Sequence, residues 1–321
     1  MEFSFTSEVQ TSFINQESKT LFVVEAHNKE LNSFKWVEEN KSLLEKILLT
    51  YGGILLRNFN ILSVSDFSRL AQIICPNLLD YTYRSTPRTK LGGKVYTATE
   101  YPAERTILMH NENSYSKSWP QKIMFYSVIV ASDGGETPIA DSRSVYQKID
   151  PIIKNKFEEK GVLYVRNYHR GIDLNWQQVF QTESKSEVEM YCKSNDIEVE
   201  WKSGNPELTT RQRCQATTTH PLTGEIVWFN QAHLFHSSAL EDNVLSSLLN
   251  EVGEDSLPRN AYYGDGSIIE KEVLDHIRAI YDQEKIKFKW QKRDVMILDN
   301  LLMAHGREPY AGERKVAVTM S

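Results

Sequence analysis

Short segments rich in β-branched and aromatic residues constrain the fold of this chain more than any other feature of its sequence. Glycine, proline and aspartate separate these segments, as is typical of strands joined by turns. We expect strands in residues 54–59, 122–132, 162–168, 215–221, 225–236, 293–305 and 314–320.

Helical patterns interrupt these strands. Residues 37–53 carry apolar side chains at helical spacing and end at a Gly-Gly pair, and a second helix is expected over residues 65–75 with Ser65 as its N-cap. Three longer segments also have helical character, the last of them strongly amphipathic. They are residues 141–161, 186–201 and 267–283.

Many short strands with long helical inserts favour a β-sandwich or jelly roll decorated by helices over a sheet of βαβ units. The sequence has neither a Gly-x-Gly-x-x-Gly motif nor a Walker loop, the signatures of nucleotide-binding βαβ folds. We therefore expect a mainly β fold with α insertions, in a single domain over residues 1–321, with residues 1–80 as an N-terminal elaboration packed on the core.

Charge and cysteine content limit the partners and the compartment. The formal net charge of -6 and the pI near 5.8 provide no general basic field, so nucleic acid is not an expected partner. The three cysteines are too widely spaced for a disulfide framework or a Cys-x-x-Cys metal site. No signal peptide or membrane-spanning run is apparent, so we expect a soluble cytoplasmic protein.

The stretch ILMHNENSY places His110 and Glu112 two residues apart in a segment that favours extended structure. About one His-x-Asp/Glu triplet is expected by chance in a chain of this composition, so the triplet alone is a weak signal. Side chains at i and i+2 share a face on a strand but point about 200° apart on a helix. A strand would therefore let both side chains bind one metal ion.

A second histidine is needed to complete such a site. His233 and His236 follow an aromatic strand, and a pocket-lining role and a structural role are about equally compatible with that position. His305 ends an apolar run and is followed by Arg307 and Arg314, which could hold an anion beside a metal. We therefore choose His305 as the distal ligand.

Two histidines and one carboxylate with open positions form the pattern of non-haem Fe(II) oxygenases. Two other classes of protein are compatible with the same residues. The three side chains could hold catalytic zinc in a hydrolase, although no His-Glu-x-x-His helix supports that assignment. Alternatively, the chain could be a non-catalytic jelly-roll binding protein with structural histidines.

Four motifs in order make the resemblance specific: HNE after a strand, then GGETPIAD, VWFNQAHLFH and DNLLMAHGREPYAGERKV. Together they resemble the taurine dioxygenase (TauD/TfdA) superfamily of Fe(II)/2-oxoglutarate-dependent oxygenases. Within it, the chain is similar to a natural-product branch that includes the aspartyl β-hydroxylase of syringomycin biosynthesis. The resemblance runs from about Tyr81 to the C-terminus and implies a double-stranded β-helix, or jelly roll, of the clavaminate synthase type.

The resemblance implies roles for individual residues. The iron ligands correspond to His110, Glu112 and His305, with glutamate in place of the commoner aspartate. Thr137 in GGETP corresponds to the threonine that helps to bind 2-oxoglutarate. Arg314 corresponds to the arginine that clamps the distal carboxylate of this cosubstrate, and Arg307 is its rival because many relatives place that arginine further beyond the histidine.

The resemblance further implies that O₂ and 2-oxoglutarate are consumed to hydroxylate an unactivated C–H bond, giving succinate and CO₂. Glu112 argues against a halogenase, which has Ala or Gly at that position, whereas desaturation or cyclisation would use the same ligands. The implied substrate is an amino acid or a derivative, free or tethered to a carrier protein. Candidate substrate contacts are Arg307 and, in the polar segment 81–105, Arg84 and Arg88, which could equally be surface arginines of a solvated loop. Trp228 and Asn230 could form a pocket wall, although aromatic residues in a strand more often fill the core.

Overall fold

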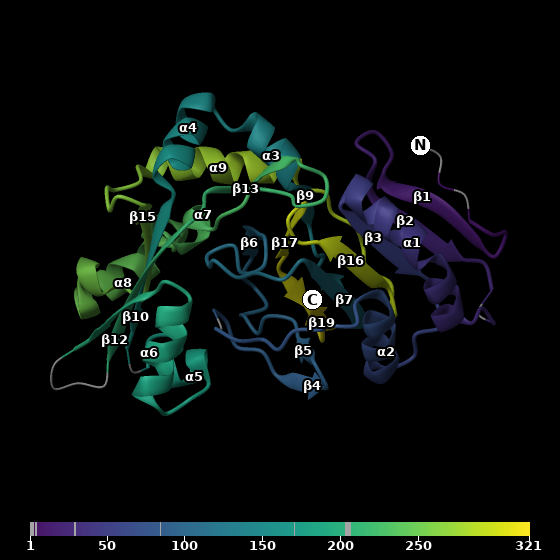
Figure 1. The fold of residues 1–321 in the computed structure, drawn as a ribbon, viewed down its shortest axis with the longest axis horizontal. Coiled ribbons are helices and arrows are strands. Elements are labelled where there is room, and N and C mark those ends of the chain that lie inside the picture. Colours follow the sequence, from purple (N-terminus) through teal and green to yellow (C-terminus); the bar gives the residue numbers. More distant parts are fainter. Residues whose placement is uncertain (1–2, 4, 29, 84, 170, 203–206) are drawn as a thin grey trace.

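A large and a smaller β-sheet dominate the computed structural model, which describes residues 3, 5–28, 30–83, 85–169, 171–202 and 207–321. In Figure 1 the large sheet lies on the right and the smaller one on the left, with strands β6 and β17 between them. Strands from both ends of the chain enter the large sheet, because residues 9–15 and 315–320 both contribute to it.

The large sheet has the order β1-β2-β3-β16-β7-β19-β5-β4. Its neighbouring strands are antiparallel except for the parallel pair β2–β3, which is connected by a crossover helix as parallel strands require. The strands are β1 (Val9–Asn15), β2 (Thr20–Ala26), β3 (Gly53–Arg57), β16 (Val295–Asp299), β7 (Lys122–Ile129), β19 (Lys315–Met320), β5 (Val95–Thr97) and β4 (Lys90–Gly92).

Both faces of the large sheet are apolar, which explains why β7 is hydrophobic along most of its length. Met124 and Tyr126 pack into a cluster under the first two helices. Ile123 and Phe125, which alternate with them, pack into a separate cluster on the opposite face. The second face is the one that borders the candidate site described below.

Helices α1 (Ser33–Tyr51) and α2 (Val64–Ile74) cover the first face, as the sequence predicts. Helix α1 ends at Gly52, whose φ of 73° is the left-handed conformation that glycine adopts without strain. The N-cap of α2 is Ser63 rather than Ser65: the Ser63 hydroxyl accepts a hydrogen bond from Asp66 N. Ser65 was a plausible cap by residue type, but it lies inside the first turn of the helix.

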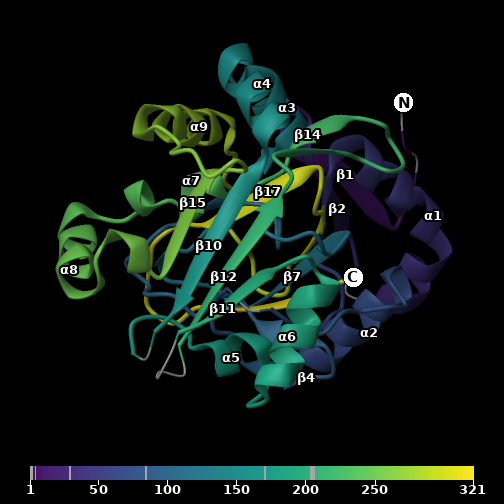
Figure 2. The same cartoon turned by 60° about the vertical axis from the view of Figure 1, so that its left-hand side comes forward.

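The smaller sheet has the order β11-β12-β10-β15, and most of the remaining helices lie around it (Figure 2). Its strands are β11 (Glu198–Trp201), β12 (Leu208–Cys214), β10 (Val162–Tyr168) and β15 (Arg259–Tyr263). The helices are α3 (Ser142–Lys148), α4 (Pro151–Lys160), α5 (Trp176–Phe180), α6 (Lys185–Ser194), α7 (Ala232–Phe235), α8 (Asp242–Val252) and α9 (Lys271–Glu284), with 3-10 turns at Ser237–Ala239 and Glu254–Ser256.

Several predicted elements are shorter than expected or are divided. The helix expected over 186–201 ends at Ser194 and is followed by strand β11. The strand expected over 225–236 ends at Trp228, after which residues 232–235 form α7. A pattern of aromatic and β-branched residues does not reveal such breaks, because tertiary packing decides where a short strand stops.

The closing strand expected over 293–305 is in fact two strands in different sheets. β16 belongs to the large sheet, whereas β17 (Met303–Arg307) is the middle strand of a three-stranded sheet with β6 (Ile107–His110) and β9 (Ile139–Asp141). Two small two-stranded pairs complete the β-structure: the hairpin of β13 (Thr217–Thr219) with β14 (Ile226–Trp228), and the pair of β8 (Asp133–Gly134) with β18 (Tyr310–Ala311), which are distant in the sequence.

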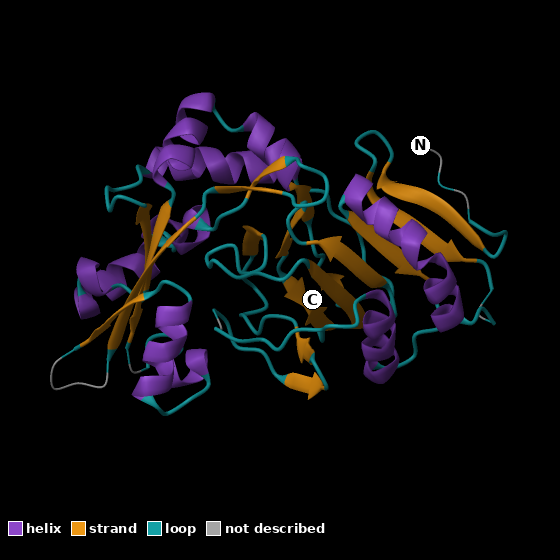
Figure 3. Ribbon diagram, viewed as in Figure 1, coloured by secondary structure: helices purple, strands orange, loops and turns teal. Residues whose placement is uncertain are grey.

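The protein is therefore mainly β with helical insertions, as Figure 3 shows. Assignment of residues 1–321 to a single domain stays a prediction. Among the described helices, none combines the length and the apolar character that crossing a membrane demands.

Candidate metal centre

Two neighbouring strands bring His110 and His305 together. β6 and β17 are antiparallel with His110 directly opposite His305, and the two ring centroids are 4.6 Å apart. Glu112 joins them from the turn that follows β6. The ligand atoms of the three side chains all lie within 4.8 Å of one another, and this is the only such group of three or more found among the described residues.

The route by which Glu112 reaches this group differs from the expected one. The strand ends at His110, so a shared strand face does not place Glu112 beside the histidine. Asn300 holds the turn instead: its Oδ1 accepts a hydrogen bond from Glu112 N at 2.7 Å, and its Nδ2 donates to Glu112 O at 3.0 Å. Sequence reasoning missed Asn300, although it lies in the DNLLMAH motif.

Side chains from the α7 region hold the other edge of β6. Gln231 Nε2 donates to Asn111 O at 2.8 Å, and His233 Nε2 lies 2.8 Å from Met109 O. Because a carbonyl can only accept, His233 must carry its proton on Nε2. Burial lowers the pKa of His233 to about 3, so its ring is neutral and supports the strand that carries His110.

The protonation of His110 suits a metal ligand. Its Nδ1 lies 2.7 Å from Leu108 O and must donate to it, which leaves the lone pair on Nε2 available. Burial and the neighbouring His305 lower the pKa of His110 to about 4. The imidazole is therefore neutral near pH 7, the form that binds metals.

Glu112 is held in its ionised form by its neighbours. Burial by itself would raise the pKa of this carboxyl group, but the Arg88 guanidinium, with His305 next, outweighs burial and lowers the pKa well below its usual value. Arg88 Nη2 donates to Glu112 Oε2 at 2.9 Å and to Oε1 at 3.1 Å. Arg88 thus contacts a candidate ligand, and its predicted contact with substrate stays a prediction.

A cavity borders the three-residue group. Its polar lining comes from residues that are distant in the sequence, namely Arg88, His110, Thr137, His305, Arg307 and Arg314. Its apolar wall includes Phe125, Val316 and Val318 from the large sheet. Phe125 also packs edge-on against His305, with ring centroids 5.1 Å apart. The structure therefore brings both predicted cosubstrate residues, Thr137 and Arg314, to the cavity of the histidines.

Thr137 and Arg314 form one unit with Gly135. The hydroxyl oxygen of Thr137 accepts from Trp290 Nε1 at 3.1 Å and from Arg314 Nη2 at 3.4 Å, so its own proton is free to reach a ligand. Arg314 Nε donates to Gly135 O at 2.8 Å. Gly135 has a φ of +72°, and a Cβ there would lie 2.9 Å from Arg314 Cδ, so only glycine fits.

The two rival arginines differ in how their donors are used. Arg307 donates to the backbone carbonyls of Tyr101, Pro102 and Arg105, which fixes that loop. Burial, together with the nearby charge of Arg307, lowers the pKa of Arg314 to about 10. Burial also lowers the pKa of Arg307, so the pKa does not separate the two residues. The use of the Arg307 donors on backbone carbonyls does, and Arg314 therefore stays the candidate for the carboxylate clamp.

The other predicted substrate residues lie elsewhere. Trp228 is fully buried and packs edge-on against Phe157 in the core, with ring centroids 5.1 Å apart. Asn230 is also fully buried, and its side chain bonds to the backbone of Ala216 and Ala232. Neither residue lines the cavity, so a pocket-wall role for them is not supported. Arg84 lies outside the described residues.

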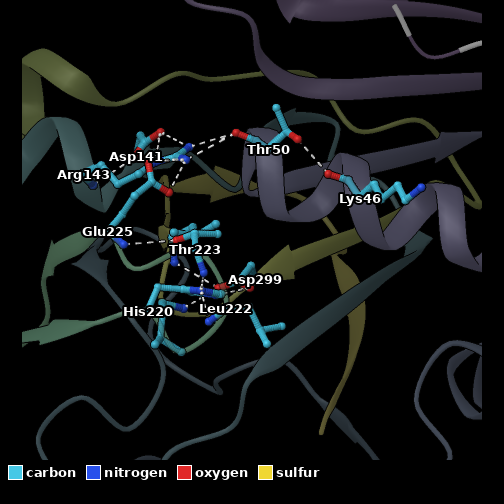
Figure 4. A network of polar contacts seen from close by, with 11 residues as sticks. Lys46, Thr50, Asp141, Arg143, His220, Leu222, Thr223, Glu225 and Asp299 are labelled. Atoms are coloured by element: carbon cyan, nitrogen blue, oxygen red, sulfur yellow. Dashed lines mark hydrogen bonds and ion pairs between the residues drawn. The ribbon is translucent and has the colours of Figure 1, made fainter. Parts of the chain in front are cut away.

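A second histidine–carboxylate group lies at the end of β16 (Figure 4). His220 Nε2 donates to Asp299 Oδ2 at 3.0 Å, while its Nδ1 accepts from Leu222 N and Thr223 N. Asp299 Oδ1 accepts from the N–H groups of residues 301 and 302. All these polar atoms have partners within the protein, so the group is structural. It fixes the turn that carries Asn300.

Arg143 extends the same polar network toward the N-terminal helix. It forms an ion pair with Asp141 at 2.7 Å and one with Glu225 at 3.1 Å, and it donates to Thr50 O near the end of α1. Figure 4 shows these contacts together. They join α1, the start of α3 and the β13–β14 hairpin behind the candidate site.

The donor set fits a divalent first-row metal such as Fe(II). Two neutral imidazoles and one carboxylate converge, and the cavity beside them leaves room for further ligands. The same donors also suit zinc, so the donor set alone does not choose the metal.

Comparison with known proteins identifies relatives over nearly the whole chain. The family model described as taurine catabolism dioxygenase TauD, TfdA family, matches residues 16–320. The dapdiamide synthesis protein DdaC of Enterobacter agglomerans is 47% identical over 277 residues, which cover 86% of this chain and 84% of that protein. A clavaminate synthase-like protein of Arabidopsis thaliana is 27% identical over 294 residues, which cover 88% of this chain and 86% of that protein.

A solved structure has the same architecture. It is that of PvcB, described as an Fe, alpha-ketoglutarate dependent oxygenase from an isonitrile synthetic pathway. It superposes with a TM-score of 0.57 and 15% sequence identity, covering 99% of this chain and 93% of PvcB. The likeness confirms the expected fold, a jelly-roll core decorated by helices.

Proposed function

The chain belongs to the taurine catabolism dioxygenase TauD, TfdA family and is an Fe(II)/2-oxoglutarate-dependent dioxygenase, and on that premise we propose that it hydroxylates an unactivated C–H bond of an amino acid or an amino-acid derivative. The zinc hydrolase and the non-catalytic binding protein are thereby set aside. Desaturation or cyclisation at the same centre is the second candidate reaction.

We assign the iron ligands to His110, Glu112 and His305. The observation that carries this assignment is the convergence of their ligand atoms within 4.8 Å beside a cavity that Arg314 and Thr137 also line. With 2-oxoglutarate and O₂, the bound iron supplies the oxidising chemistry, which yields succinate and CO₂. The protein binds, orients and shields the reactants.

Arg314 and Thr137 are assigned to the cosubstrate. The guanidinium of Arg314 pairs with the distal carboxylate of 2-oxoglutarate, and the Thr137 hydroxyl donates a further hydrogen bond. The unit that they form with Gly135 holds both donors in place before the ligand arrives, so little side-chain freedom is lost on binding. The apolar wall around Phe125 excludes water from the reacting groups.

The proposed substrate class is based on the relatives of this chain. The 47% identical relative is a dapdiamide synthesis protein, which supports a role in specialised metabolism. An amino-acid substrate, either free or tethered to a carrier protein, follows the resemblance to the syringomycin-pathway hydroxylase. We place the enzyme in the cytoplasm because Cys75, Cys192 and Cys214 are all free and buried.

The proposal is tested by turnover of an amino-acid panel. Iron is loaded without oxygen, 2-oxoglutarate and each candidate are added free or as a carrier-protein thioester, and oxygen is then admitted. Hydroxylation adds one oxygen atom to the mass of one candidate and releases succinate, whereas desaturation or cyclisation removes two hydrogens. Succinate release with no change in the mass of any candidate would refute the amino-acid substrate class.

A further inference from the structure

We propose that Arg88 is a positioning residue that orients the carboxylate of Glu112 toward the metal, and that this contact allows a glutamate to act as the ligand at position 112. The inference rests on the proposed metal site and adds to it a residue that none of the family roles named above includes.

The contact between the two side chains is buried and involves both carboxylate oxygens. Arg88 Nη2 lies 2.9 Å from Glu112 Oε2 and 3.1 Å from Oε1, and both side chains are only 4% exposed. Oε2 also lies 3.7 Å from His305 Nε2, too far for a hydrogen bond but on the side of the histidines. The contact therefore restrains the carboxylate in an orientation in which Oε2 lies toward His305.

A glutamate needs such a constraint more than an aspartate does. Asn300 fixes the backbone of Glu112 through two hydrogen bonds, which leaves only the side-chain torsions free. Glutamate has one more of these torsions than aspartate, so an unrestrained carboxylate would sample more positions and lose more entropy on binding a metal. Carboxylate ligands are commonly fixed by a hydrogen-bonding partner in this way.

Arg88 is itself held in place by its surroundings. Its guanidinium lies over the Tyr81 ring, 4.4 Å from the ring centroid. The backbone on both sides of it is hydrogen bonded: Glu100 N donates to Pro87 O, and Thr89 exchanges hydrogen bonds with Thr97. Thr97 is in β5, a strand of the large sheet, so Arg88 is mounted on the core of the fold rather than on a free lid.

The positive charge of Arg88 and its effect on the orientation of Glu112 should change metal affinity in opposite directions. The experiment separates the two effects. A guanidinium beside a divalent ion repels it, so removing Arg88 would tighten metal binding if charge were dominant. If orientation is dominant, removing Arg88 weakens binding. Loss of such a partner commonly costs a factor of about 10 to 100 in metal affinity.

The test is a double-mutant cycle read out by Co(II) affinity. Wild type, Arg88→Met, Glu112→Asp and the double variant are titrated with Co(II), and its visible absorption and the shift in melting temperature are recorded. We expect Arg88→Met to weaken binding by about 10- to 100-fold in the wild-type background. In the Glu112→Asp background, where the shorter carboxylate no longer reaches the guanidinium, we expect a change below about threefold.

A matched control separates orientation from general stability. Arg57 forms an ion pair with the buried Asp294 at 2.7 Å, away from the residues that line the cavity. We expect Arg57→Met to lower the melting temperature and to leave Co(II) affinity unchanged. If Arg88→Met does not fold, Arg88→Lys replaces it in the same cycle, because lysine keeps the charge but its ammonium group ends short of the position of Nη2.

Three results would overturn the inference: unchanged Co(II) affinity in the Arg88 variant, tighter binding in it, or an equal loss whether position 112 carries glutamate or aspartate. A wild-type protein that binds neither Co(II) nor Fe(II) would instead contradict the proposed metal site. The two failures are therefore distinguishable.

Discussion

Among the described residues, the histidine–carboxylate groups at positions 220/299 and 110/112/305 differ in what their polar atoms contact. In the pair His220–Asp299, each ring nitrogen and each carboxylate oxygen has a hydrogen-bond partner from the protein. In the group His110–Glu112–His305, the lone pair of His110 Nε2 has no partner among the described residues, and a cavity borders both histidines. The first group is closed and the second is open.

The contrast between these two groups means that residue type alone does not identify a functional site. Histidine and carboxylate make a structural joint where every polar atom is satisfied, and a ligand site where an imidazole lone pair without a partner lies beside a cavity. The two groups are connected, because Asp299 precedes Asn300 and Asn300 holds the backbone of Glu112. Substitutions in the open group should act above all on activity, and those in the closed group on stability.

Loss of a ligand in the open group should have the largest effect. For Glu112→Ala we expect 2-oxoglutarate-dependent succinate formation to fall at least about 1000-fold, because the metal loses its charged ligand. The metal-free variant should also unfold at lower urea than wild type, because the buried Arg88 guanidinium loses its partner, so activity is compared only under conditions where both proteins are folded. Full turnover in this variant would contradict the site.

Loss of the carboxylate in the closed group should instead destabilise the protein. Asp299→Ala leaves the donors of His220, Leu301 and Leu302 without an acceptor, and we expect it to lower the unfolding free energy by about 3 kcal/mol. As a control, Glu225→Gln at the exposed edge of the same network should change it by less than about 0.5 kcal/mol. A loss below about 1 kcal/mol in Asp299→Ala would show that the network is not closed as described.

The two arginines that line the cavity should differ in their effect on 2-oxoglutarate binding. We expect Arg314→Met to raise the KM for 2-oxoglutarate by about 30-fold, the cost of losing a charge-assisted pair in a buried site. Arg307→Met should raise it by less than about threefold, because Arg307 spends its donors on backbone carbonyls. The reverse order in steady-state kinetics would make Arg307 the clamp.

His233, a buried histidine outside both groups, should reveal itself through the pH dependence of stability. The pKa of His233 is about 3 in the folded protein, lowered from 6.5 mainly by burial. Below pH 6.5 the unfolded chain binds a proton that the native protein does not, so stability falls as the pH drops from about 6.5 toward 3. The slope is at most about 1.4 kcal/mol per pH unit. Urea unfolding at about pH 7, 6 and 5 should show a shallower decline for His233→Gln, whose amide can still donate to Met109 O.

The sequence predicted the candidate ligands better than the residues that support them. Order along the chain and family motifs led to His110, Glu112 and His305, and the structure brings these three side chains together. The strand argument for Glu112 was wrong, because β6 ends at His110 and Asn300 orients the turn. That contact joins residues far apart in the chain, and no local pattern predicts it.

The fold shows the same limit. Long amphipathic helices such as α1 and α9 were predictable, since periodicity is a local property. The break of residues 293–305 into two strands was not, because the choice of sheet depends on partners elsewhere in the chain. The N-terminal pair β1–β2 also escaped notice, since it is stabilised by extending the large sheet beside β3.

The short passage from β16 to β17 has a practical consequence for redesign. Only three residues connect these two strands, which belong to different sheets. The first of the three, Asn300, is hydrogen bonded to the backbone of Glu112. A redesign that lengthens this link to reshape the pocket will therefore also move the acidic ligand.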